Sequence, residues 1–310
     1  TATLALSACQ SLPGTQIHYF SQAFNSVNTV SQPLLDDLAL AERNQGQAIA
    51  MRRAQGKSHS GVERCPPAQF AWQLAADGKQ GFINGFCNSD AVYFSTLDDP
   101  PFTASMRASL AAIEAYANLL TTLANGSNID NAVGQIKVIG HSIEGLSPSG
   151  LAAAGTLDAA IVALSPLLKS LAQQSNAAEA RQIILAGAPK IDALIQALHT
   201  SAPVLFNDLI EASSQRLSRE ANSADLDRIS SYRVAVANYL VLLDKLGKAW
   251  RMTVDAAQTP GQSSNLAALA RYSAELKADA DAVRKTFAVL RNGGNLSSAQ
   301  NPKPLNGVNK

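Results

Sequence analysis

The chain has 310 residues and a formal net charge of +1, with 46% hydrophobic, 16% charged and 5% aromatic residues. That length supports a large core in one or two domains. The near-neutral charge argues against a protein that binds nucleic acid. After an N-terminal stub, no apolar run reaches the roughly eighteen residues that a membrane-spanning helix needs.

The N-terminus carries a short motif, Leu6-Ser7-Ala8-Cys9, behind five small or apolar residues. It resembles the lipobox of bacterial lipoproteins, in which a branched apolar residue and two small residues precede the cysteine that is acylated. The resemblance implies that residues 1–8 are the remnant of a secretory signal and that Cys9 anchors the protein to membrane lipid. Gln10 is not the Asp that often holds such proteins at the inner membrane. The resemblance therefore implies the outer membrane, facing the periplasm.

Residues 9–16 are typical of a flexible tether, and residues 17–55 predict a long helix. Apolar side chains recur there mostly three, four or seven positions apart, at Phe20, Phe24, Val27, Leu34, Leu38 and Ala41. We expect Pro33 to kink this helix or to mark a second start. The densest basic stretch indicates a solvated helix face, with lipid headgroups or an anionic glycan as the alternative contact; it comprises Arg43, Arg52, Arg53, Lys57 and Arg64.

Residues 56–101 form the one segment that does not predict a helix. It holds Cys65 and Cys87, which are the only cysteines besides Cys9. In the oxidising periplasm that the N-terminal motif implies, we expect a disulfide that closes a loop of roughly 20 residues and contributes about 3 kcal/mol. The alternative is a pair of buried free thiols. The aromatic residues gathered here predict either a local mini-core or a partner surface.

Five further segments predict helices from their apolar spacing: 102–124, 129–146, 153–174, 177–199 and 266–290. The first follows Asp98-Asp99-Pro100-Pro101, an acid-and-proline start. Pro166 and Pro189 are each a kink or a boundary. Pro203 opens a long stretch to about residue 257, whose polar middle at 218–227 is either a solvent-exposed rod or a broken joint. Residues 293–310 predict a disordered tail.

A weak internal echo links two of these segments. Tyr116-x-x-Leu119-Leu120-x-x-Leu123 recurs as Tyr239-x-x-Leu242-Leu243-x-x-Leu246. The echo has two interpretations, a duplicated pair of helical halves or the ordinary spacing of leucine-rich helices.

Gly140-His141-Ser142-Ile143-Glu144-Gly145 resembles the Gly-x-Ser-x-Gly turn that presents the nucleophile of α/β-hydrolases. Glu144 stands where that tight turn requires Gly, and the apolar spacing across it predicts an uninterrupted helix. We therefore do not expect Ser142 to be a nucleophile. His141 and Glu144 lie three apart, but their order is reversed from that of metal-binding bundles and no second copy follows. We expect no catalytic residue, metal or cofactor; the other histidines, His18, His59 and His199, lack a ligand partner in the sequence.

These patterns predict an all-α protein: an elongated bundle of long, mostly antiparallel helices over residues 17–292, with one disulfide-tied irregular insertion at 56–101. We expect a membrane-anchored envelope lipoprotein that acts as a non-enzymatic scaffold or binds a protein partner. The alternative is a helical carrier of a small or lipidic ligand. A hydrolase or metal enzyme is the third hypothesis, and it requires Ser142 or His141 in a cleft beside a second ionisable group. An enlarged apolar cavity would favour the carrier, and a solid core would favour the scaffold.

Overall fold

The computed structural model describes residues 14–54, 90–125, 177–218, 222–259 and 264–291. They form α1 (Gly14–Ala54), α2 (Ala91–Phe94), α3 (Pro101–Ala124), α6 (Ala177–Leu217), α7 (Ser223–Gln258) and α8 (Ser264–Arg291). No strand occurs within these ranges, so the described part of the chain is all-α, as predicted. The helices predicted at 129–146 and 153–174, and the tail at 293–310, lie outside the described residues.

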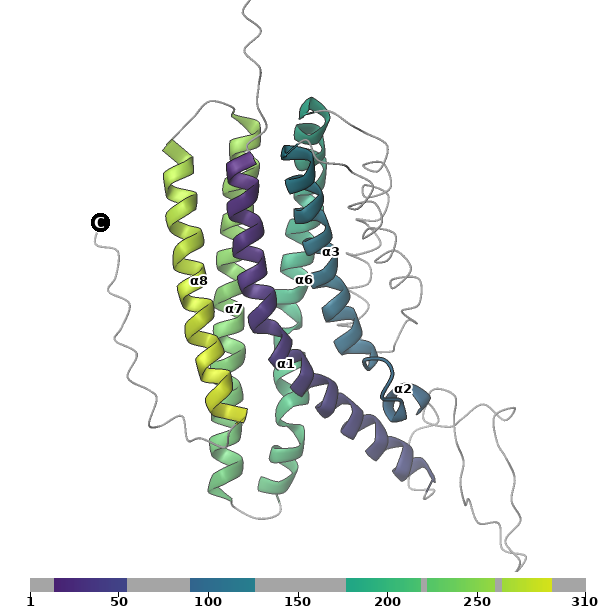
Figure 1. Ribbon diagram of the computed structural model, residues 1–310. Helices are drawn as coiled ribbons and strands as arrows, with labels where there is room; N and C mark the ends of the chain where they lie inside the picture. Colours follow the sequence, from purple (N-terminus) through teal and green to yellow (C-terminus); the bar gives the residue numbers. More distant parts are fainter. Residues whose placement is uncertain (1–13, 55–89, 126–176, 219–221, 260–263, 292–310) are drawn as a thin grey trace, which may run out of the picture.

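The five long helices lie side by side, and α1 contacts all four of the others (Figure 1). α3 and α7 run opposite to α1, and α6, α7 and α8 alternate in direction along the chain. α1 and α8 are neighbours that run the same way, and the Ser273 hydroxyl of α8 donates to the Tyr19 carbonyl of α1 at 3.1 Å. α6, which also contacts α1, runs the same way as α1 too, so α1 packs between two antiparallel and two parallel neighbours.

α1 begins three residues before the predicted start at 17 and continues without a break through Pro33. It begins at Gly14, inside the expected tether at 9–16, so that tether boundary is wrong by the residues 14–16. Pro33 lies within its 41 residues and marks no second start. Figure 1 shows a change of direction in the middle of α1. A proline lacks the N–H donor and crowds the preceding turn, so a bend without a break is its expected effect.

α6 runs through Pro189 and Pro203, so the predicted boundary between residues 199 and 203 is wrong. Both proline rings are exposed, so the carbonyls that lose a donor can turn towards water. The hydroxyls of Thr200 and Ser201 donate to carbonyls three residues earlier in the same turn, at 3.1 and 2.8 Å. A proline on the solvent-exposed face of a helix can thus be accommodated, because the contacts on the buried face of the helix remain intact.

The chain breaks instead in the polar stretch at 218–227, which confirms the broken joint. α6 ends at Leu217 and α7 begins at Ser223. The Asn222 side chain caps α7 by accepting a hydrogen bond from the Ala224 N–H at 2.9 Å. Across the joint, the guanidinium of Arg216 donates from both Nε and Nη2 to the carboxylate of Asp225.

An aromatic cluster fills the centre of the core. The Trp250 ring of α7 lies 4.9 Å from that of Phe20 on α1 and 5.7 Å from that of Tyr116 on α3, centroid to centroid, and all three side chains are fully buried. The indole N–H donates to the Ala188 carbonyl of α6 at 3.3 Å. Beside it, Gly187 leaves the space that the Tyr116 ring occupies, because a Cβ there would overlap the ring. Four helices therefore meet at one set of rings.

The echo at Tyr116 and Tyr239 falls on buried positions in both copies. Both tyrosines are buried, as are Leu119 and Leu120 of α3 and Leu242, Leu243 and Leu246 of α7. Burial on one helix face explains the shared spacing without common descent. A duplication therefore stays a prediction.

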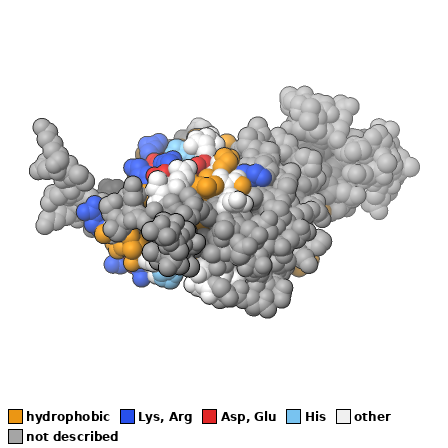
Figure 2. Space-filling view, turned by 90° about the horizontal axis from the view of Figure 1, so that it is seen from above, with side chains coloured by type: hydrophobic (Ala, Val, Ile, Leu, Met, Phe, Trp, Pro, Cys, Tyr) orange, Lys and Arg blue, Asp and Glu red, His pale blue; other side chains and the backbone are white. Residues whose placement is uncertain are grey.

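The described surface mixes charge and hydrophobicity. Seen from above (Figure 2), acidic and basic side chains lie next to one another and beside hydrophobic ones. No described helix combines the length and the apolarity needed to cross a bilayer.

Candidate functional site

The C-terminal half of α1 holds the segment around α2 through backbone carbonyls. Arg43 donates to the carbonyl of Ser95 from Nε (3.2 Å) and to that of Asp98 from Nη2 (2.7 Å). Gln47 donates to the carbonyl of Tyr93 at 2.9 Å. Arg43 is therefore a structural residue rather than a member of a solvated basic face, which corrects its predicted role.

The start of α3 is capped by Glu42, a residue of α1 that is only 2% exposed. Its Oε1 accepts from the N–H of Phe102 at 2.9 Å, and its Oε2 accepts from the N–H and the hydroxyl of Thr103, both at 3.0 Å. The first turn of a helix leaves such N–H groups unpaired and favours a negative charge. Glu42 thus satisfies a helix terminus that lies 60 residues away in the chain.

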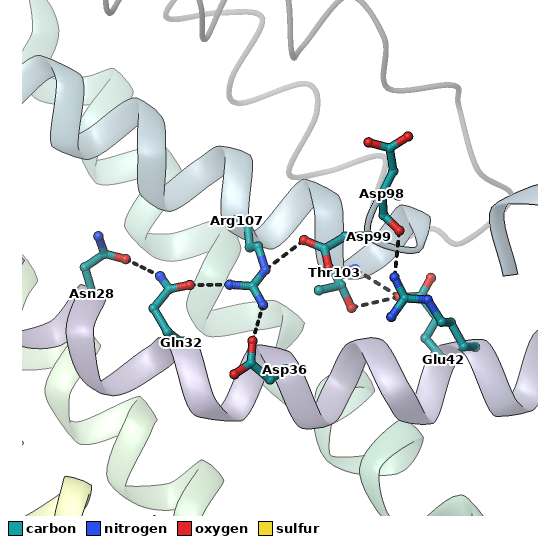
Figure 3. Close-up of polar contacts among 9 residues, drawn as sticks. Asn28, Gln32, Asp36, Glu42, Asp98, Asp99, Thr103 and Arg107 are labelled. Carbon is teal, nitrogen blue, oxygen red and sulfur yellow. Dashed lines mark hydrogen bonds and ion pairs between the residues drawn. The ribbon is translucent and has the colours of Figure 1, made fainter. Parts of the chain in front are cut away.

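Asp99, the acid next to that terminus in the sequence, pairs with Arg107 of α3 instead (Figure 3). Arg107 Nε lies 2.8 Å from Asp99 Oδ2, and Nη2 donates to Asp36 Oδ1 of α1 at 2.6 Å. Nη1 donates to Gln32, whose own amide donates to Asn28 at 2.7 Å. Because these side chains are partly exposed, each ion pair contributes at most about 1 kcal/mol. Their main effect is to fix the register of α3 on α1.

Two acids of α6 face the same end of α1. The Oδ2 atom of Asp208 is buried and has no hydrogen-bond partner among the described residues. Burial, and then the negative charges of Glu42 and Glu211, raise the pKa of Asp208 to about 6. Glu211 accepts hydrogen bonds from Gln45 of α1 at 3.3 Å and from Gln215 at 2.7 Å.

Tyr93 of α2 completes this group, which we call the acidic joint: Glu42, Asp208, Glu211 and Tyr93. The Tyr93 ring packs against Gly46 of α1 so closely that a Cβ on the glycine would overlap it. Burial and the nearby charges of Glu42, Asp90 and Asp208 raise the pKa of Tyr93. Burial also raises the pKa of Glu42, although the hydrogen bonds from Phe102 and Thr103 act in the opposite direction. In the acidic joint, burial therefore favours the protonated form of several ionisable groups.

A second candidate surface is the open groove between α1 and α8, with a volume of about 450 Å³. Val30 and Ala280 are buried residues in its lining. Its walls carry amides and hydroxyls from α1 and charged side chains from α8, among them Gln22, Asn25, Ser26, Thr29, Lys277 and Arg284. An apolar base with a polar rim is the usual composition of a protein–protein contact surface. We call this feature the α1–α8 groove.

The histidines of the described helices lie in simple polar pairs. His18 shares a hydrogen bond with Gln22 at 2.9 Å, and His199 Nε2 lies 3.5 Å from Asp244 Oδ1. Within the described ranges, no group of three or more His, Cys, Asp or Glu side chains is placed to hold a metal ion.

The other residues singled out from the sequence lie outside the described residues. They are the anchor Cys9, the disulfide pair Cys65 and Cys87, and the residues His59, His141, Ser142 and Glu144. The anchor, the disulfide and the roles considered for Ser142 and His141 therefore stay predictions.

The comparisons with known proteins return nothing: no family model, no curated protein and no solved structure matches this chain.

Sequence reasoning missed the acidic joint. Glu42 follows Leu34 and Leu38 at the spacing of the buried face of α1, so a charged residue on an apolar stripe was the available signal. Asp208 likewise lies three and four positions after the buried residue Leu205 and the half-buried Val204. A carboxylate on such a face requires a helix terminus, a cation or a proton, and only the packing shows which.

Proposed function

We propose that this protein is a membrane-anchored lipoprotein of a bacterial envelope that acts as a non-enzymatic scaffold and binds a protein partner on the periplasmic side of the outer membrane. The observation that carries the scaffold assignment is the contrast between a core filled with aromatic rings and an open groove on the surface. A partner that lies along the α1–α8 groove would contact two long helices at once. The bundle would then present that partner without enclosing a ligand.

The anchor hypothesis rests on Leu6-Ser7-Ala8-Cys9. Cys9 lies only a few residues before Gly14, where α1 begins. A 41-residue helix extends about 60 Å at 1.5 Å per residue. An acylated Cys9 would therefore place one end of an elongated bundle at the bilayer and the acidic joint far from it.

The alternative function, a helical carrier of a small or lipidic ligand, needs an apolar cavity between helices. Trp250, Phe20 and Tyr116 occupy the position where the long helices meet, and each is fully buried. Rings in contact at 4.9 and 5.7 Å leave no room for a ligand at that point. The geometry thus supports the scaffold more than the carrier.

A disulfide between Cys65 and Cys87 is part of the same proposal. These residues belong to the segment between the end of α1 at Ala54 and the start of α2 at Ala91. Because Arg43, Gln47 and Tyr93 tie α1 to α2, a bridge would staple a loop whose two ends are already held together.

The anchor is tested by fractionation of cells that express the precursor with its signal sequence. The Cys9→Ala variant is expected to leave the membrane pellet at high salt, because the acyl chains that hold the protein are lost. The double variant Cys65→Ala with Cys87→Ala serves as the control and stays in the pellet. A Cys9→Ala protein that still pellets contradicts the anchor.

The same cells test the groove as a partner surface by cross-linking. Ala274→Arg places a long charged side chain in the α1–α8 groove and should abolish the cross-linked species of higher mass. Ala282→Arg, at an exposed position of the same helix outside the groove, should leave it intact. Equal behaviour of the two variants contradicts the groove and leaves the anchor result unaffected.

A further inference from the structure

Asp208 is an ionisable residue whose surroundings do not stabilise a negative charge. Its Oδ2 atom is buried, and no described residue donates a hydrogen bond to it. A buried carboxylate without a donor costs free energy when ionised and much less when protonated. The polar groups nearest to Asp208 therefore determine whether its carboxyl group is ionised or protonated in the folded protein.

The groups that act on Asp208 are acidic. Glu42 faces it from α1, and Glu211 lies one turn further along α6. From α2 it is faced by Tyr93, whose hydroxyl is neutral at its ordinary pKa and whose pKa is raised further here. On α7, Arg233 lies over the Phe206 ring at 5.7 Å; on α6 itself, Arg216 is paired with Asp225 of α7.

Protonation of Glu42 would also reduce the repulsion among these acids, but it would disturb the hydrogen bonds that Glu42 accepts. Both of its carboxylate oxygens accept hydrogen bonds from the first turn of α3, at 2.9 and 3.0 Å. Protonation would replace one acceptor by a donor that faces the N–H groups of that turn. The proton that reduces the repulsion between α1 and α6 therefore belongs on Asp208.

We propose that the acidic joint is an acid-stabilised latch, in which protonation of Asp208 fastens α6 to the end of α1 that carries α2 and α3, and deprotonation loosens it. The protonated carboxyl carries no charge and no longer repels Glu42. The latch involves α1 at Glu42 and Gly46, before α1 ends at Ala54, and α2 at Tyr93, after α2 begins at Ala91. It would thus set how firmly both ends of the intervening segment are held.

The sign of the pH dependence follows from the direction of the shift. The pKa of Asp208 is raised from 3.8 to about 6, so the folded state binds the proton more tightly than the unfolded state. Stability is therefore gained as the pH falls from about 7 to about 4 and is lost as the pH rises through about 6. A full shift of this size would change the unfolding equilibrium constant roughly a hundredfold; because the side chain is only partly buried, we expect about tenfold.

The test compares urea unfolding of the full chain between pH 5 and pH 8 for the wild type and Asp208→Asn. For the wild type, the unfolding equilibrium constant should be about tenfold smaller at pH 5 than at pH 8. Asp208→Asn should lose most of this pH dependence. Asp227→Asn, at an exposed position of α7, is the matched control and should retain the wild-type profile. Parallel profiles for the wild type and Asp208→Asn would overturn the latch.

Carbon-13 NMR of the side-chain carboxyls gives a readout that does not depend on how well the variant folds. In the wild type, the Asp208 signal should titrate with a midpoint near 6, as the raised pKa requires. In Glu42→Gln, which removes one of the neighbouring charges, that midpoint should move down. A midpoint near 4 in the wild type would overturn the proposal.

Discussion

The same packing device occurs beside both halves of α1, with opposite chemistry. Beside the first half, Gly187 of α6 makes room for the Tyr116 ring of α3, in the aromatic cluster that includes Phe20 of α1; in the second half, Gly46 of α1 makes room for the Tyr93 ring of α2. Tyr116 is fully buried among rings, whereas Tyr93 is half-buried among carboxylates. Close packing alone therefore does not define the character of an interface. One half of α1 packs against rings that do not titrate, and the other packs beside carboxyl groups that do.

Removal of the central ring should produce the largest effect. Trp250→Ala deletes a fully buried indole that contacts two other rings and donates to the Ala188 carbonyl. We expect a loss of about 3–5 kcal/mol in the free energy of unfolding, measured by urea denaturation. Tyr93→Ala at the other end should cost about 1 kcal/mol, because that ring is only half-buried. Similar losses for the two variants would remove the contrast between the ends.

Loss of the cap on α3 should cause the second-largest decrease in the free energy of unfolding. Glu42→Ala leaves the N–H groups of Phe102 and Thr103 without their buried acceptor, so we expect a loss of about 2 kcal/mol. Asp36→Ala removes an acid of the same helix that is 52% exposed and should cost less than about 1 kcal/mol. The comparison is made by urea denaturation at pH 7. If Glu42→Ala costs no more than Asp36→Ala, the cap does not stabilise α3.

The two glycines test the packing device directly. Gly187→Ala forces a Cβ into the immobile Tyr116 ring, and we expect a net loss of about 1–2 kcal/mol after the gain in helix propensity is counted. Gly46→Ala meets Tyr93, which belongs to the four-residue α2 and can move outward. The propensity gain of about 1 kcal/mol should then nearly cancel the clash. Melting temperatures of the two variants measure the difference, and an equal drop would show that both ends are equally rigid.

Much of the fold could be predicted from local spacing. The helix at 102–124 was predicted to within one residue of α3, and that at 266–290 to within two of α8. Pro203 is a misleading signal, because it lies inside α6 and not at a helix boundary, whereas Pro33 lies inside α1, which bends as one of the two expectations requires. A proline removes one hydrogen bond, but its ring on the solvent side leaves the buried contacts of the helix intact. The polar stretch at 218–227, with Asn222 as a cap, was the more reliable signal of a break.

The candidate site could not be predicted in the same way. Asp98 and Asp99 precede α3 and indicated its start, yet the capping carboxylate is that of Glu42. Arg43 was grouped with exposed basic residues and instead binds two backbone carbonyls. Such assignments depend on which helix lies opposite, and residue spacing within one helix does not contain that information.

Helical periodicity is a property of neighbours along the chain, so the amino-acid sequence already indicates where most helices lie and which of their faces are apolar. The packing of the helices against one another sets the rest: α1 and α8 run in parallel, Glu42 caps α3, and Asp208 Oδ2 has no donor among the described residues. A buried polar group is satisfied or left unsatisfied by whatever the fold brings against it. For Glu42 and Thr103 the two partners are 61 residues apart, and for Gln45 and Glu211 they are 166 residues apart.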